Sequence, residues 1–99
     1  MRTIEVQQLI APIREAVQQI NFHTPAPTLS KLTDILHLEP SPVGRQAMQD
    51  IVENREIAAQ RQVPMCQDTG MVIVFVELGQ AVQLVGGAVR QAITEGVRQ

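Results

Sequence analysis

The sequence has 99 residues, a formal net charge of -2 and a hydrophobic content of 44%, which allows one small domain and excludes a chain that is disordered by composition. It contains no basic run and no apolar stretch long enough for a membrane helix, so neither a nucleic-acid surface nor a membrane span is predicted. The single cysteine cannot form an internal disulfide, and with no secretory signal this indicates a cytoplasmic protein.

The first part of the chain is predicted to be helical. Apolar residues recur at three- and four-residue spacing over residues 3–20, which predicts an amphipathic helix. Thr3 would cap this helix, and Pro12 would kink or restart it. A connector with two prolines at residues 21–27 leads to a second helix over residues 28–38, whose first residue is a threonine that suits the capping position.

A third helix carries signals at both ends. Ser41 offers a hydroxyl cap and Pro42 suits the first helical position. The helix is predicted to run to about Arg61, and Pro64 prevents any continuation. Its predicted buried stripe consists of Ala47, Met48, Ile51, Val52, Ala58 and Ala59. Its wetter side is predicted to carry Asp50, Glu53, Arg55, Glu56 and Arg61.

Residues 71–78 are the most apolar stretch of the chain. They are mostly β-branched or aromatic, which predicts a strand covered on both faces. The pair at 79–80 suits a tight hairpin turn, and a second strand is predicted over residues 81–85. A final helix is predicted to start near Ala88, after the Gly86-Gly87 pair. The predicted fold is therefore α+β, with N-terminal helices followed by a β-hairpin and a further helix.

The loop before the apolar stretch, Pro64-Met65-Cys66-Gln67-Asp68-Thr69-Gly70, brings together a thiol, an amide, a carboxylate and a hydroxyl. A lone cysteine is more often a small buried hydrophobe than a ligand, but polar neighbours are a poor setting for an inert core thiol. On the residues alone, Asp68 fits an Asx-turn that organises the loop as well as it fits a catalytic group. Met65 and Met71 are interpreted as packing residues.

A resemblance extends over this loop and its flanks. The run PMCQDTGMVIVFVELGQ resembles the α region of the class I (iron–sulfur) fumarate hydratases, and the tartrate dehydratase α subunits are a related branch that shares the CQDTG core. The preceding run SPVGRQAMQDIVENREIAAQRQ and the following run AITEGVRQ extend the resemblance from about Ile13 to Gln99. Ala81 departs from the family, which usually has an acidic residue after the GQ pair.

The resemblance implies a hydro-lyase that reversibly hydrates fumarate to L-malate, a reaction of the tricarboxylic acid cycle. It implies that Cys66 ligates a [4Fe–4S] cluster in which three cysteines hold three irons and the fourth iron binds substrate. Gln67 would bind a carboxylate of the dicarboxylate substrate. Asp68 would bind the substrate as well and act as the catalytic acid–base group.

Because this chain supplies one of the three cysteines, the resemblance implies that residues 1–99 are a partial N-terminal domain, inactive alone, within a larger iron–sulfur hydro-lyase domain. The other cluster ligands would come from the rest of the α chain, and a β subunit or domain and an oligomeric assembly are expected. Two alternatives stay open. The chain is also consistent with a tartrate dehydratase α-subunit fragment, or with a non-enzymatic remnant that binds a partner chain.

Overall fold

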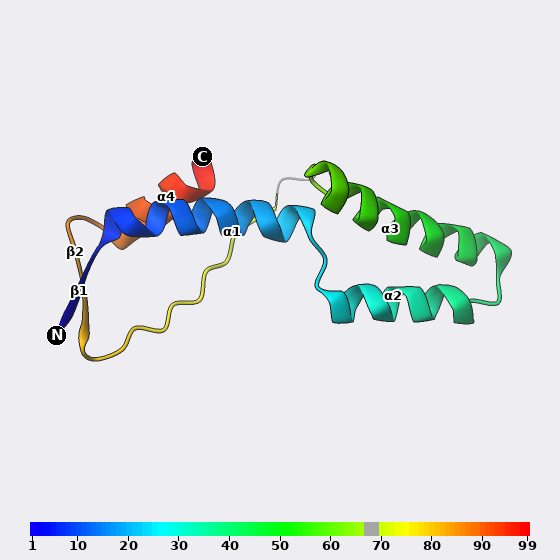
Figure 1. Cartoon of the computed structure of the whole chain (residues 1–99), viewed down its shortest axis with the longest axis horizontal. Coiled ribbons are helices and arrows are strands. Elements are labelled where there is room, and N and C mark those ends of the chain that lie inside the picture. Colours follow the sequence, from blue (N-terminus) through cyan, green and yellow to red (C-terminus); the bar gives the residue numbers. More distant parts are fainter. Residues whose placement is uncertain (67–69) are drawn as a thin grey trace. The chain divides into compact units, whose positions relative to one another are not determined.

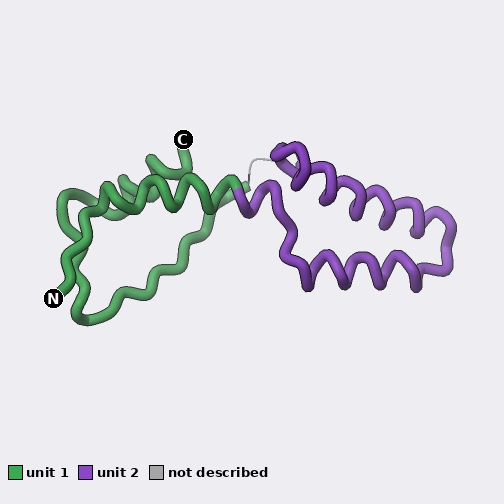
Figure 2. Tube along the Cα trace, viewed as in Figure 1, with its two compact units in different colours: residues 1–18, 68–99 green, residues 19–67 purple. Residues whose placement is uncertain are grey.

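A computed structural model describes residues 1–66 and 70–99. Their elements in chain order are β1 (Arg2–Glu5), the 3-10 helix η1 (Val6–Leu9), α1 (Ile10–Phe22), α2 (Ala26–Leu38), α3 (Pro42–Arg61), β2 (Val82–Val85) and α4 (Val89–Arg98) (Figure 1). The chain divides into two compact units, residues 19–67 and residues 1–18 with 68–99 (Figure 2). The α+β class is confirmed. Among the described residues, no helix has the length and apolar character that crossing a membrane requires.

The unit of residues 19–67 is built on α2 and α3, which pack against each other. α3 begins as predicted, because the Ser41 hydroxyl accepts a hydrogen bond from the Gly44 N–H at 3.3 Å and Pro42 occupies the first turn. Its predicted end at Arg61 is also confirmed. α2 starts at Ala26 with Pro25 as its N-cap, two residues earlier than predicted, so Thr28 lies inside the helix and its predicted capping role was wrong. Pro27 is accommodated in the first turn, where a missing N–H leaves no intrahelical hydrogen bond unmade.

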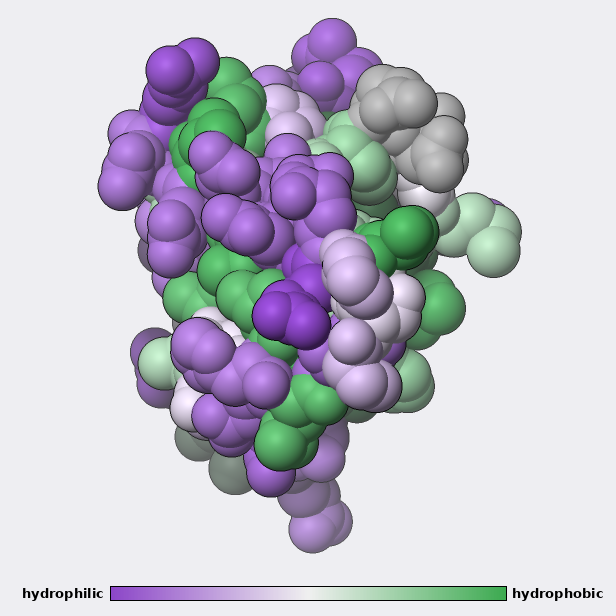
Figure 3. Space-filling view, turned by 90° about the vertical axis from the view of Figure 1, so that its right-hand side faces the viewer, coloured by the Kyte–Doolittle hydropathy of each residue, from purple (hydrophilic) through white to green (hydrophobic). Residues whose placement is uncertain are grey.

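Burial along α3 follows the predicted stripe only in part. Ala58 is 1% exposed, whereas Ala47 and Ile51 are exposed. Arg55 is half-buried, so its placement on the wetter side was wrong. Figure 3 looks onto the end where α2 and α3 are joined and shows apolar side chains at the surface among polar ones.

In the other unit, β1 and β2 form a parallel pair in which Arg2 lies opposite Val82 and Glu5 lies opposite Val85. The prediction of a helix over residues 3–20 was therefore wrong before residue 10, where β1 and η1 stand instead. Thr3 pairs within the sheet and caps no helix. α1 begins at Ile10, two residues before the predicted restart, so Pro12 lies in its first turn, where a missing N–H leaves no intrahelical hydrogen bond unmade.

The predicted hairpin is absent from the described residues. Residues 70–79 have no regular secondary structure, and the partner of β2 is β1. The second strand was predicted almost correctly, since β2 spans Val82–Val85, but the strand over 71–78 was wrong. A strand forms when a neighbour satisfies its backbone hydrogen bonds, and β-branched composition does not supply that neighbour.

α4 starts where the sequence predicted, with Ala88 as its N-cap. Gly86 and Gly87 precede it with φ angles of 83° and 144°, which favour glycine. Gly96 is buried in α4, and a Cβ at this position would lie 2.7 Å from Cγ2 of Ile13 in α1. This close approach fixes how α4 lies against α1.

Candidate functional site

Cys66 follows α3 after a short turn. Gln62 takes the left-handed conformation, with φ 54° and ψ 50°, and the Val63 N–H donates to the Ala58 carbonyl at 3.2 Å. A non-glycine residue rarely adopts this conformation. The turn ends the helix and leads the chain to Met65 and Cys66, whose thiol is exposed and free.

Met65, the residue before the candidate ligand, is held through both its backbone and its side chain. Its N–H donates to the Asn21 carbonyl at 3.1 Å, and its own carbonyl accepts from Nδ2 of Asn54 at 2.8 Å. Its sulfur lies 3.6 Å from the Thr24 hydroxyl and also contacts a guanidinium nitrogen of Arg55. Met65 is therefore contacted by the last turn of α1, by the connector between α1 and α2, and by α3.

The contacts of Asn54 and Arg55 with Met65 were not predicted from the sequence. A signal was present, since Asn54 lies one helical turn before Ala58, the most buried residue of α3, and therefore shares its face. Arg55 has a further unusual property. Its Nε is buried and has no hydrogen-bond partner among the described residues, while its Nη1 contacts the Met65 sulfur, which is a weak acceptor.

Of the predicted site residues, the structure places Cys66 alone. Gln67 and Asp68 lie outside the described residues, so their expected contacts with substrate are not tested. Within residues 1–66 and 70–99, no three His, Cys, Asp or Glu side chains come together as a metal site. An exposed thiol that is not in a disulfide nevertheless suits a thiolate ligand. Among the described residues, Cys66 would therefore suit one thiolate ligand of a cluster and forms no metal site with other side chains.

The other unit contains a groove of about 460 Å³ between η1, the first turn of α1 and α4. Val6, Ile10 and Ala92 contribute apolar side chains, and Gly86 and Gly87 line its edge. None of its described lining residues is a cysteine or a histidine. The groove therefore offers no thiolate or imidazole ligand of its own.

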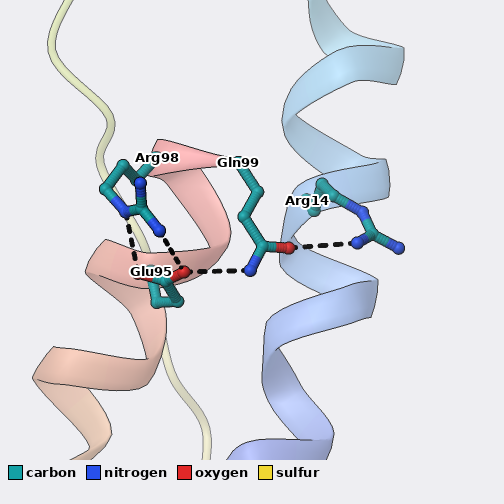
Figure 4. A network of polar contacts seen from close by, with 4 residues as sticks. All are labelled: Arg14, Glu95, Arg98 and Gln99. Carbon is teal, nitrogen blue, oxygen red and sulfur yellow. Dashed lines mark hydrogen bonds and ion pairs between the residues drawn. The ribbon is translucent and has the colours of Figure 1, made fainter.

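A network of hydrogen bonds links the C-terminal end of α4 to α1 (Figure 4). The Glu95 carboxylate accepts hydrogen bonds from Arg98 at 2.6 and 2.9 Å and from Nε2 of Gln99 at 2.9 Å. Oε1 of Gln99 accepts from Arg14 of α1 at 3.0 Å. The Arg98 hydrogen bond, helped by that of Gln99, lowers the pKa of Glu95 to about 2. The network is structural, because it ties α4 to α1.

Cys66 thus carries an exposed, free thiol, and the residue before it is held by hydrogen bonds to Asn21 and Asn54. Residues 10–99 match the sequence profile of the fumarate hydratase (Fumerase) family. The chain belongs to this family of iron–sulfur hydro-lyases, and the resemblance noted in the sequence is confirmed.

A putative L(+)-tartrate dehydratase subunit alpha from Methanocaldococcus jannaschii is 33% identical to this chain over 66 residues. The aligned part covers 67% of this chain and 23% of the relative, so the chain corresponds to about a quarter of that protein. No solved structure matches the chain.

Proposed function

We propose that the protein is the N-terminal part of an iron–sulfur hydro-lyase α chain that reversibly hydrates fumarate to L-malate. The observation that carries the proposal is the family match over residues 10–99, which includes Cys66. The exposed, free thiol supports it, because soft thiolates are the ligands that iron–sulfur clusters need.

In this proposal Cys66 is one of three cysteine ligands of a [4Fe–4S] cluster, and the other two come from outside these 99 residues. When bound, the cluster supplies a Lewis acid that assists loss of the substrate hydroxyl. The Gln67 amide donates to a substrate carboxylate. The Asp68 carboxylate accepts a hydrogen bond from the substrate hydroxyl and carries its proton.

The name of the archaeal relative suggests a partner subunit and a second candidate substrate. Because that relative is named a subunit alpha, a β subunit or domain is proposed as a partner here. Because it is named for L(+)-tartrate, tartrate is the second candidate substrate. Comparison of kcat/KM for fumarate hydration and for water loss from L(+)-tartrate separates the two. We expect a preference for fumarate of about tenfold or more, and a preference for tartrate would replace fumarate in the proposal.

The ligand role of Cys66 is tested in the complete enzyme that contains this segment. Cys66→Ala removes a thiolate from the cluster, so iron content, visible absorbance and activity should fall together. A variant that retains its iron and its absorbance would show that Cys66 is not a ligand.

The role of Asp68 is tested by Asp68→Asn in the same enzyme. The side chain keeps its size but loses the charge that accepts a proton, so turnover per bound cluster should fall by roughly a hundredfold or more while iron content is retained. Near-normal turnover per cluster, with lower stability, would instead assign Asp68 to an Asx-turn.

The 99-residue chain by itself is expected to be inactive. One thiolate does not hold a [4Fe–4S] cluster against exchange, because such clusters take several cysteine ligands. Anaerobic reconstitution of this chain should therefore leave no chromophore near one cluster per chain after desalting. A stable one-to-one preparation would contradict the need for ligands from outside.

A further inference from the structure

We propose that Asn54 and Arg55 of α3 are positioning residues that fix Met65 and thereby set where the Cys66 thiol is presented. The inference rests on the proposed role of Cys66 as a cluster ligand. All the residues that take part belong to the unit of residues 19–67, so the arrangement is set within one compact part of the chain.

The backbone contacts carry the first step. The Met65 carbonyl and the Cys66 nitrogen belong to one planar peptide group, which also includes both Cα atoms. The 2.8 Å hydrogen bond from Asn54 to that carbonyl therefore orients the plane that carries the Cα of Cys66. The hydrogen bond from the Met65 N–H to the Asn21 carbonyl, at 3.1 Å, holds the preceding peptide plane as well. What remains free at Cys66 is its own φ angle and its side-chain torsion.

The side chain of Met65 is held in place as well as its backbone. Methionine is unbranched and adopts many rotamers in a loose setting. Here the Thr24 hydroxyl and the Arg55 guanidinium both contact its sulfur, which restricts the side chain to one place against α3.

The unpartnered Nε of Arg55 indicates that the contact between Arg55 and the Met65 sulfur does more than stabilise the fold. A buried guanidinium nitrogen without a partner is destabilising, because its desolvation is not offset. A lysine or glutamine at the surface of α3 would avoid this cost. Such uncompensated polar groups are expected where a position serves function, and this one is in contact with the residue next to the thiol.

The test compares Asn54→Ala with a matched variant on the same helix, in the complete protein. Gln46→Ala also removes a side-chain amide donor from α3, but that amide donates to Asp50 at 3.0 Å and takes no part in holding Met65. Asn54 is exposed, so neither substitution should disturb a core. The readouts are amide hydrogen exchange of the Met65 N–H, the midpoint of thermal unfolding and, after anaerobic reconstitution, the rate of iron loss to a chelator.

We expect Asn54→Ala to accelerate exchange of the Met65 N–H by roughly three- to tenfold, because losing the hydrogen bond to the Met65 carbonyl favours the local opening that also breaks the bond from the Met65 N–H to Asn21. Gln46→Ala should leave that exchange unchanged while giving a similar unfolding midpoint. Iron loss should be faster in Asn54→Ala than in Gln46→Ala, because a less constrained thiolate dissociates more easily. Arg55→Gln should show the same pattern with a smaller change in exchange.

Equal Met65 exchange in Asn54→Ala and Gln46→Ala would overturn the positioning role, even if Cys66→Ala loses the cluster. Faster exchange with unchanged iron loss would also overturn it, because the anchor would then be purely structural. Failure of the proposed function is seen separately, as iron retained by Cys66→Ala.

Discussion

The two compact units of this chain reach their structures by different routes. In residues 19–67 the helices begin and end at local signals, such as the Ser41-Pro42 start of α3 and the turn at Gln62. In the other unit, β1 and β2 pair across almost the whole length of the chain, so the contact depends on closing a long loop. The unit of residues 19–67 therefore holds the loop at Met65 through its own contacts, whereas the unit of residues 1–18 and 68–99 depends on contacts between distant segments.

The difference is sharpest on the two sides of the CQDTG motif. On one side, Met65 is held by hydrogen bonds to its backbone and contacts to its sulfur. On the other side, Met71 is 91% exposed and Phe75 is 90% exposed. The exposed apolar residues of this segment are Met71, Val72, Ile73, Val74, Phe75, Val76 and Leu78. A contiguous exposed apolar stretch of this kind favours self-association.

The largest expected effect follows from this exposed segment. The isolated 99-residue chain should self-associate through residues 71–78, and the double variant Ile73→Lys, Phe75→Lys should weaken association by roughly a hundredfold or more, because each substitution removes a large apolar group from the contact. Sedimentation velocity over a range of concentrations measures this. Leu38→Lys, at a residue of α2 that is 80% exposed, is the control and should change little. A chain that stays monomeric at all concentrations would contradict the prediction.

Packing of α4 against α1 tests the unit of residues 1–18 and 68–99 at a close contact. Gly96→Ala would place a methyl group 2.7 Å from Ile13 Cγ2 and 3.0 Å from the Ile10 carbonyl. We expect a loss of about 1–3 kcal/mol in the free energy of unfolding, partly offset by the higher helix propensity of alanine. Gly44→Ala in α3 is the control, since the atoms nearest to its methyl would belong to the flexible side chain of Glu39. Equal stabilities in urea unfolding would show that α4 can shift away from α1.

The turn after α3 allows a change of opposite sign in the unit of residues 19–67. Gln62 holds a φ of 54° without being a glycine, so Gln62→Gly should relieve strain and raise the free energy of unfolding by about 0.5–1 kcal/mol. Urea unfolding measures the difference. A decrease in stability would mean that the Gln62 side chain makes a contribution larger than the strain.

The smallest effect is expected from the exposed network at the end of α4. Because the pKa of Glu95 is lowered from 4.5 to about 2, its interaction with Arg98 stabilises the fold above pH 4.5 and is lost as the pH falls toward 2. Glu95→Gln should remove this part of the acid dependence of the melting temperature. Arg98→Gln should remove the larger share of the same part, because the Gln99 hydrogen bond remains, and the double variant should remove no more than Glu95→Gln alone. Additive losses would indicate that the two residues act separately.

The sequence by itself determined the features that depend on neighbours along the chain. The start and end of α3, the end of α2 and the start of α4 were predicted within a residue, because caps, prolines and glycines act over one helical turn. The family also followed from the sequence, since the CQDTG core and its flanks are local patterns. Cys66 could be named as a candidate ligand for the same reason.

Only the tertiary structure decided how distant segments pair. The apolar pattern of residues 71–78 indicated a strand, but pairing was decided between β1 and β2, far apart in the sequence. The hydrogen bonds of Met65 could not be predicted from the sequence either, because their partners Asn21 and Asn54 lie on separate helices. Propensity and periodicity describe what a segment can form, whereas hydrogen bonds between segments depend on which backbone groups the fold brings within reach.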